Sequence, residues 1–130
     1  MALKYPEQQI PGLKQSVSLS ISTAADGLGD VLDTKGLTLT GIALSTVWTS
    51  AGITFKVGNS TSAMYSLFNS TNSEFLLTCT SSQVHYISPD VFSGFQYIQP
   101  RSGIQGTVVA QTTATTITAF LAPVGRNLPR

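Results

Sequence analysis

The chain has 130 residues, a length that fits one domain with one hydrophobic core. Charged residues make up only 10% of it, against roughly 25% in an ordinary soluble domain. Seven Lys and Arg residues against six Asp and Glu residues leave a net charge of +1, so the composition offers no basic surface for nucleic acid or for an anionic membrane.

The N-terminal segment differs from the rest of the chain. Residues 1–14 contain Pro6, Pro11 and Gly12 and follow neither a strand nor a helix period, which predicts an extended arm. From residue 15 onward, apolar and polar residues alternate, beginning with Val17 and Leu19 between serines. We therefore divide the chain into an arm over residues 1–14 and a folded domain over residues 15–130.

The next two segments predict a loop and a bent strand. Residues 24–35 contain Asp-Gly and Gly-Asp pairs and end at Gly36, which is typical of a loop or long turn. Leu37 and Leu39 then share one face, whereas Ile42 and Leu44 have the opposite parity. A bulge or bend at Gly41 would explain this change of face.

The remainder of the chain repeats short alternating segments separated by turn residues. Expected strands cover residues 53–57, 64–68, 75–79, 84–87, 95–99, 107–111 and 113–121. A turn that could contain one helical turn is expected over residues 88–92, and another turn over residues 101–103. Many short strands without helices predict an all-β fold: a single-domain β-sandwich, jelly-roll-like, with an extended N-terminal arm.

The alternation also predicts the core of this sandwich. The side chains expected to point inward are Val17, Leu19, Ile21, Phe55, Leu77 and Ile117. Cys79 shares the parity of Phe75 and Leu77, so we interpret it as a buried thiol and not as a nucleophile.

Chemistry-bearing residues are few. The chain has one histidine, His85, and one cysteine, and no carboxylates are paired at an acid–base spacing, so we expect no enzyme activity, no metal and no cofactor. Asp26, Asp30 and Asp33 are interpreted as turn caps, with a calcium site as the alternative. The aromatic residues are interpreted as core, with a sugar-stacking platform as the alternative; they are Trp48, Tyr65, Phe92, Phe95 and Tyr97.

The N-terminal sequence carries no charged region followed by an apolar stretch, as a signal peptide would, and no apolar run approaches the ~20 residues of a membrane span. We therefore expect a protein that is made in the cytoplasm and is not secreted by the general route.

One stretch of the chain is similar to a known group of proteins. Residues 92–103 read FSGFQYIQPRSG and are followed by VVAQ and a Thr-rich strand, while residues 47–55 read VWTSAGITF. This pattern resembles the small virion proteins of tailed bacteriophages, whose motif has the form Phe-x-Gly-x-Arg/Tyr-Ile/Leu-Lys-x-Arg-Ser-Gly. The chain departs from it at Gln99-Pro100, where a basic residue is usual, and at Thr107, where Pro is common.

The resemblance implies a jelly-roll-like sandwich on the phage head, as a capsid decoration (cement) protein or the base of a head fibre. The alternatives are a tail or collar adaptor of the virion and a carbohydrate-binding module, for which a host glycan would be the ligand. The expected partners are the major capsid protein and copies of this chain, because an uncharged surface rich in Ser and Thr, 33 residues in all, can be buried without ionic desolvation. A homotrimer is preferred, since three-fold axes recur on icosahedral shells.

Two groups of residues are the candidate contacts. Leu3, Lys4, Tyr5 and Pro6 lie in the arm, which is suited to adding a strand to a neighbour. Arg101, Ser102 and Gly103 are expected on a turn, where the guanidinium could bind carbonyls of a neighbouring loop or subunit, or instead pin two strands of its own domain.

Overall fold

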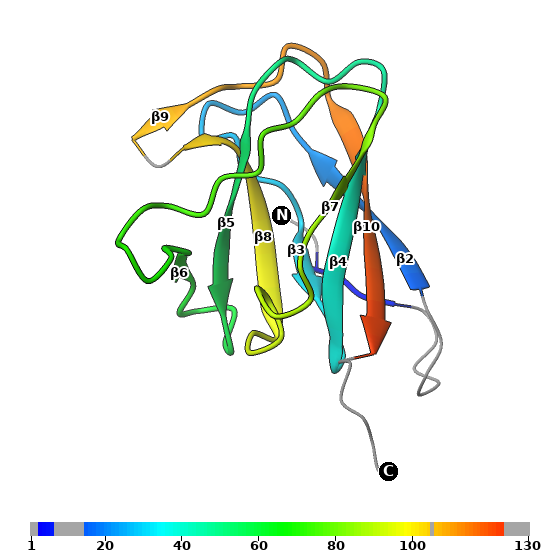
Figure 1. The fold of residues 1–130 in the computed structure, drawn as a ribbon. Helices are drawn as coiled ribbons and strands as arrows, with labels where there is room; N and C mark the ends of the chain where they lie inside the picture. The colour runs from blue at the N-terminus through cyan, green and yellow to red at the C-terminus, as the bar shows by residue number, and fades with distance from the viewer. Residues whose placement is uncertain (1–2, 7–14, 105, 124–130) are drawn as a thin grey trace, which may run out of the picture.

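The protein is a β-sandwich in the computed structural model, which describes residues 3–6, 15–104 and 106–123. Two sheets pack face to face, as Figure 1 shows, so the predicted all-β sandwich is confirmed. Within the described ranges the chain forms no helix, and hence none that is long and apolar enough to cross a membrane.

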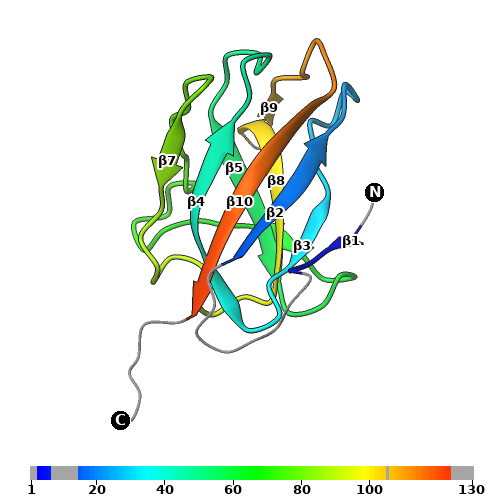
Figure 2. The same cartoon turned by 90° about the vertical axis from the view of Figure 1, so that its right-hand side faces the viewer.

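One sheet has four strands in the order β2-β10-β4-β7, and it faces the viewer in Figure 2. Its strands are β2 (Gln15–Ile21), β4 (Leu37–Leu44), β7 (Val84–Tyr86) and β10 (Thr115–Pro123). All the pairings are antiparallel, and the inward residues of β10 lie opposite those of β2, as in the pair Ile117 and Leu19. These are the strands with the clearest alternation, because one face meets the core and the other meets solvent.

Strand β4 has an irregularity next to Gly41, the position at which the sequence predicts a bulge or bend. Phe120 of β10 pairs with Gly41, but the next residue, Leu121, pairs with Leu39, so Thr40 has no partner in the ladder. This extra residue is a β-bulge, which restores the inward direction of Ile42 and Leu44 after the change of parity. The predicted bulge is confirmed.

The other sheet has six strands, in the order β1-β3-β8-β5-β6 with β9 attached to β8. They are β1 (Leu3–Lys4), β3 (Val31–Asp33), β5 (Ile53–Gly58), β6 (Tyr65–Ser66), β8 (Tyr97–Ile104) and β9 (Thr107–Val108). Strand β1 runs parallel to β3, while the other pairings are antiparallel.

Several sequence-based expectations for this sheet were wrong. Residues 24–35 are not all loop, because they contain β3, whose pairing with β8 has no local signal. Residues 101–103 are not a turn, because β8 continues through them to Ile104. Residues 75–79 form no strand and make one isolated bridge, at Leu77, although their alternation is correct: Phe75, Leu77 and Cys79 pack on or in the core. Residues 88–92 form turns without a helix.

The core lies between the sheets and is centred on Phe55 and Phe92, whose rings meet edge to face with centroids 4.9 Å apart. Phe75 packs against both rings. Leu19, Ile21, Phe55 and Ile117 are fully buried, and Val17 and Leu77 are half-buried against the same cluster, so the predicted inward face is confirmed. Both sheets thus contribute side chains to one core.

Candidate functional site

The predicted contact residue Arg101 lies in a strand and not on a turn, and its side chain is buried. It belongs to the central strand β8, opposite Thr54 of β5, and its side chain retains 8% of its exposure. Because Phe55 pairs with Pro100, the register puts Arg101 and Thr54 on the face of the sheet away from the phenylalanine cluster. The side chain is buried because the segments that carry Ser66 and Glu74 lie against this face, which the turn interpretation did not consider.

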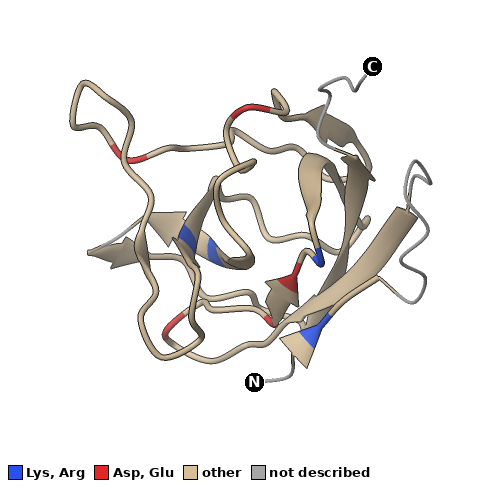
Figure 3. Cartoon of the chain, turned by 90° about the horizontal axis from the view of Figure 1, so that it is seen from below, with Lys and Arg blue, Asp and Glu red and all other residues tan. Residues whose placement is uncertain are grey.

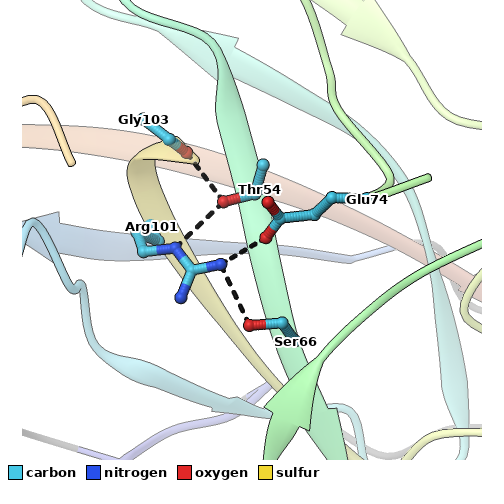
Figure 4. Close-up of polar contacts among 5 residues, drawn as sticks. All are labelled: Thr54, Ser66, Glu74, Arg101 and Gly103. Carbon is cyan, nitrogen blue, oxygen red and sulfur yellow. Dashed lines mark hydrogen bonds and ion pairs between the residues drawn. The ribbon is translucent and has the colours of Figure 1, made fainter. Parts of the chain in front are cut away.

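Arg101 is held by three neighbours, shown in Figure 4. Its Nε donates to Thr54 Oγ1 at 3.1 Å, and its Nη2 donates to Ser66 Oγ at 3.1 Å and to the carboxylate of Glu74. Thr54 Oγ1 in turn donates to the carbonyl of Gly103 at 2.7 Å. We call Thr54, Ser66, Glu74 and Arg101 the arginine cluster.

The cluster is a charge pair shielded from water. The side chain of Glu74 retains 11% of its exposure, so both charges have left most of their hydration and are compensated mainly by each other and by two hydroxyls. Removing Arg101 would take away the opposite charge that stabilises the carboxylate of Glu74 in this shielded place. The arrangement therefore fixes the segment around Glu74 against β5 and β8, and it leaves little of the guanidinium for another subunit.

Ser102 and Gly103 are also occupied internally. Ser102 Oγ accepts from Gln111 Nε2 at 2.8 Å, and the same amide group donates to the carbonyl of Thr49 at 3.2 Å. Gly103 has a φ of +94°, and a Cβ there would lie 2.5 Å from the nitrogen of Val109, so only glycine fits. A role of these residues in subunit contact stays a prediction, and their burial does not favour it.

The residues that carry the resemblance to phage proteins are therefore in mutual contact. Gln111 Oε1 accepts from the Thr49 amide at 2.7 Å, and Trp48 Nε1 donates to the Ala51 carbonyl at 3.1 Å, with Trp48 only 6% exposed. Through Gln111, Thr49 in the loop after β4 is joined to Ser102 near the end of β8, while Arg101 joins β8 to Thr54 of β5. These contacts hold the sandwich together, while residues 93–96 of the motif line an open pocket with Thr34, Gly36 and Leu37.

The N-terminal candidate residues lie along the edge of the six-stranded sheet of their own chain. Leu3 pairs with Val31, and Lys4 Nζ lies 3.9 Å from Asp30 Oδ2. The Tyr5 ring lies under Lys35 Nζ, 5.3 Å from ring centroid to nitrogen, and Pro6 is buried. Leu3 and Tyr5 nevertheless remain about half exposed, at 46% and 50%. The rest of the predicted arm, from residue 7 to residue 14, lies outside the described residues.

The three loop aspartates bind protein groups. Asp26 Oδ1 accepts from the Leu28 amide and Asp33 Oδ1 from the Lys35 amide, each closing a turn as the sequence predicted. Asp30 Oδ2 instead accepts from the Ser20 amide at 2.9 Å and joins the loop to β2. Among the described residues, no three His, Cys, Asp or Glu side chains gather in a way that could hold a metal ion.

His85, Cys79 and the aromatic residues also occupy structural positions. His85 Nε2 lies 3.0 Å from the Thr80 amide, which donates to it. Burial raises the pKa of the Cys79 thiol to about 11, which disfavours the thiolate that a nucleophile needs. Trp48 and Phe92 are in the core while Tyr65 is 72% exposed, so the aromatic residues do not form one platform for a sugar.

Charge is almost absent from the surface. Of the charged residues that the structure describes, only Asp26, Lys35 and Asp90 are exposed; Asp30, Asp33 and Arg101 are buried, and the others are intermediate. Figure 3 shows where the acidic and basic residues lie, and none is in the four-stranded sheet. The remaining polar surface consists largely of hydroxyls and amides.

Comparison with known proteins gave no further guide. No protein-family model, no curated protein and no solved structure matches this chain.

Sequence reasoning identified Arg101 but missed its partners. Glu74 and Ser66 lie in segments that are far from Arg101 along the chain and that carry no motif. Thr54 lies within the stretch that resembles the phage proteins, so that resemblance was the only signal that could have pointed to it.

Proposed function

We propose that this protein is a structural component of a bacteriophage virion, which decorates and stabilises the capsid as a cement protein or as the base of a head fibre. The observation that carries the proposal is the nearly uncharged surface, with three exposed charged residues in the described part of the chain. Burying hydroxyls and amides against a neighbour requires hydrogen bonds but no ionic desolvation. This surface suits permanent packing among other subunits.

The proposal is also supported by what the phage-like residues do. Trp48, Arg101, Ser102 and Gln111 bind one another or their neighbours and define one sandwich, as expected of a motif that specifies a fold. The partners in this proposal are the major capsid protein and further copies of the chain. A decoration protein that binds the assembled shell, and not its separate subunits, stabilises the shell by mass action.

The N-terminal edge is the contact that we propose for the shell. Strand β1 is the last strand of its sheet, and it leaves Leu3 and Tyr5 half exposed beside it. An edge strand offers backbone groups to a neighbouring chain, so Leu3 and Lys4 can extend the sheet towards a capsid subunit.

The experiment is co-sedimentation of the purified protein with heads that lack it, together with cryo-electron microscopy of the complete particle. We expect saturable binding to the head lattice and a higher temperature of head disruption. A variant without residues 1–14 should keep its circular dichroism spectrum and lose binding. If this variant still co-sediments at full occupancy, the contact lies elsewhere on the domain.

The same particle images test the alternatives. Density on the tail or collar instead of the head would replace the decoration role by that of an adaptor. Absence from the particle, together with a positive signal on a glycan array, would favour a carbohydrate-binding module.

A further inference from the structure

The outer edge of the four-stranded sheet is open. Strand β7 is the last strand in the order β2-β10-β4-β7, and no described residue pairs with its second edge. The hydrogen-bonded pairs with β4 are Gln83 with Leu44 and Ile87 with Thr40, and pairs of this kind alternate along an antiparallel ladder. The backbone N–H and C=O groups of Val84 and Tyr86 therefore point away from β4, outward from the sheet.

The same two residues expose large apolar side chains. Val84 is 65% and Tyr86 is 74% exposed, and they lie on the outer face opposite Ala43 and Gly41. Edge strands of monomeric proteins usually carry charged residues, which prevent pairing with other chains. Residues 80–89 contain no Asp, Glu, Lys or Arg, so this edge lacks that protection.

We propose that β7 is a self-association edge, which pairs antiparallel with β7 of a second copy about a two-fold axis at His85. In this register Val84 of one copy lies opposite Tyr86 of the other, and each pair exchanges two backbone hydrogen bonds. The two four-stranded sheets become one continuous sheet of eight strands. The contact does not depend on the virion role.

The chemistry of the edge favours a second copy as its occupant. Two-fold pairing places the exposed valine against the exposed tyrosine twice, and pairs of β-branched and aromatic residues are favourable across strands. Centring the axis on Val84 would place Tyr86 opposite Ser82, and centring it on Tyr86 would place Val84 opposite Ser88, so either shift sets a large apolar residue against a serine. No strand of this sheet contains Asp, Glu, Lys or Arg, so joining two copies brings no like-charged pair of these residues together.

The size and symmetry of the proposed β7 contact determine the expected affinity and the expected number of copies in the oligomer. A strand edge buries less than the ~1,600 Å² of a typical stable complex, so we expect a dimer that dissociates in the micromolar range. A two-fold contact closes with two copies, in contrast to the trimer that shell symmetry suggests. The mass of the isolated protein distinguishes the two.

The first test is analytical ultracentrifugation of the full chain over a range of concentrations. We expect dimers of the wild type and at least tenfold weaker association of Val84→Lys and of Tyr86→Lys. Tyr65→Lys is the matched control, because Tyr65 is as exposed but lies on β6 of the other sheet. A monomeric or trimeric wild type, or dissociation by Tyr65→Lys alone, overturns the proposal.

The second test determines the register of the proposed pairing between two β7 strands by disulfide formation under mild oxidation. Residues at position 85 would form a non-hydrogen-bonded pair with Cα atoms about 4.5 Å apart, which is within the range of a disulfide. We expect His85→Cys to form covalent dimers and Tyr86→Cys, whose equivalent lies diagonally across the axis, to form none. Native Cys79 is buried and serves as the internal background. Equal cross-linking of both variants, or none with folded His85→Cys, contradicts the register.

Discussion

The two sheets of the sandwich differ in how they use charge. The four-stranded sheet has no Asp, Glu, Lys or Arg in any strand. In β2, β4 and β10 core residues alternate mostly with Ser, Thr, Gly or Ala, while β7 exposes Val84 and Tyr86. The six-stranded sheet carries Lys4, Asp33, Lys56 and Arg101 in four of its strands, and Arg101 is buried.

This difference indicates two ways of specifying a sheet. In the four-stranded sheet, one face meets solvent and the other meets the core, and this contrast determines which side chains of each strand point inward. Its outer face, which is rich in hydroxyl groups, remains exposed. In the six-stranded sheet, β8 is buried at six consecutive residues, so alternation cannot define it. There the arginine cluster adds specific hydrogen bonds that fix the neighbouring segments. Substitutions at five positions test these contributions.

The largest expected effect comes from Phe55, which belongs to the core shared by both sheets. Phe55→Ala should lower the free energy of unfolding by ~3–5 kcal/mol, because it leaves a cavity beside Phe75 and Phe92. Urea unfolding measures it. A loss below about 1 kcal/mol would mean that this ring does not fill the core.

The next effect tests the charged sheet by itself. Arg101→Met should cost about 3 kcal/mol, because it leaves the carboxylate of Glu74 without its partner in a shielded place. The double variant Arg101→Met with Glu74→Leu should recover most of this loss. The measurement is a double-mutant cycle by urea unfolding, and costs that simply add would show that the two charges do not act as a pair.

A smaller effect concerns the thiol of Cys79, which is buried in the core. Because the pKa of Cys79 is raised from 9.0 to about 11, the unfolded thiol ionises first as the pH rises, and stability should fall between these values. Below pH 9 the thiol is protonated in both states and the contribution is fully present. Cys79→Ala should show a shallower decline over this window in thermal unfolding; parallel curves would contradict the shift.

The smallest effect is expected on the uncharged sheet. Ser18 is exposed on the outer face of β2, so Ser18→Lys should change the free energy of unfolding by less than ~0.5 kcal/mol. Chemical unfolding of this variant beside the wild type is sufficient. If the variant is strongly destabilised, the lack of charge is a requirement of folding; if not, it reflects what the outer face contacts.

The success of sequence reasoning depended on alternation more than on the sheet, since β5 of the six-stranded sheet was also predicted, over residues 53–57. Strands β2, β4 and β10, the bulge next to Gly41 and the inward residues Leu19 and Ile117 were all predicted. Each of these features can be recognised in the local sequence, because neighbouring residues point alternately to solvent and to the core. Strand β3 and the full length of β8 were missed, since both are buried in ways that erase the alternation.

The sequence by itself determined the all-β class, the single core and the scarcity of charge, because composition and short-range periodicity are properties of the chain alone. Only the tertiary structure decided that Arg101 is buried beside Glu74, that Leu3 and Lys4 pair with β3, and that β7 has an open edge. These facts depend on which distant segments meet. Pairing between segments is set by the packing of the whole sandwich, and it produces no pattern among residues that are adjacent in the sequence.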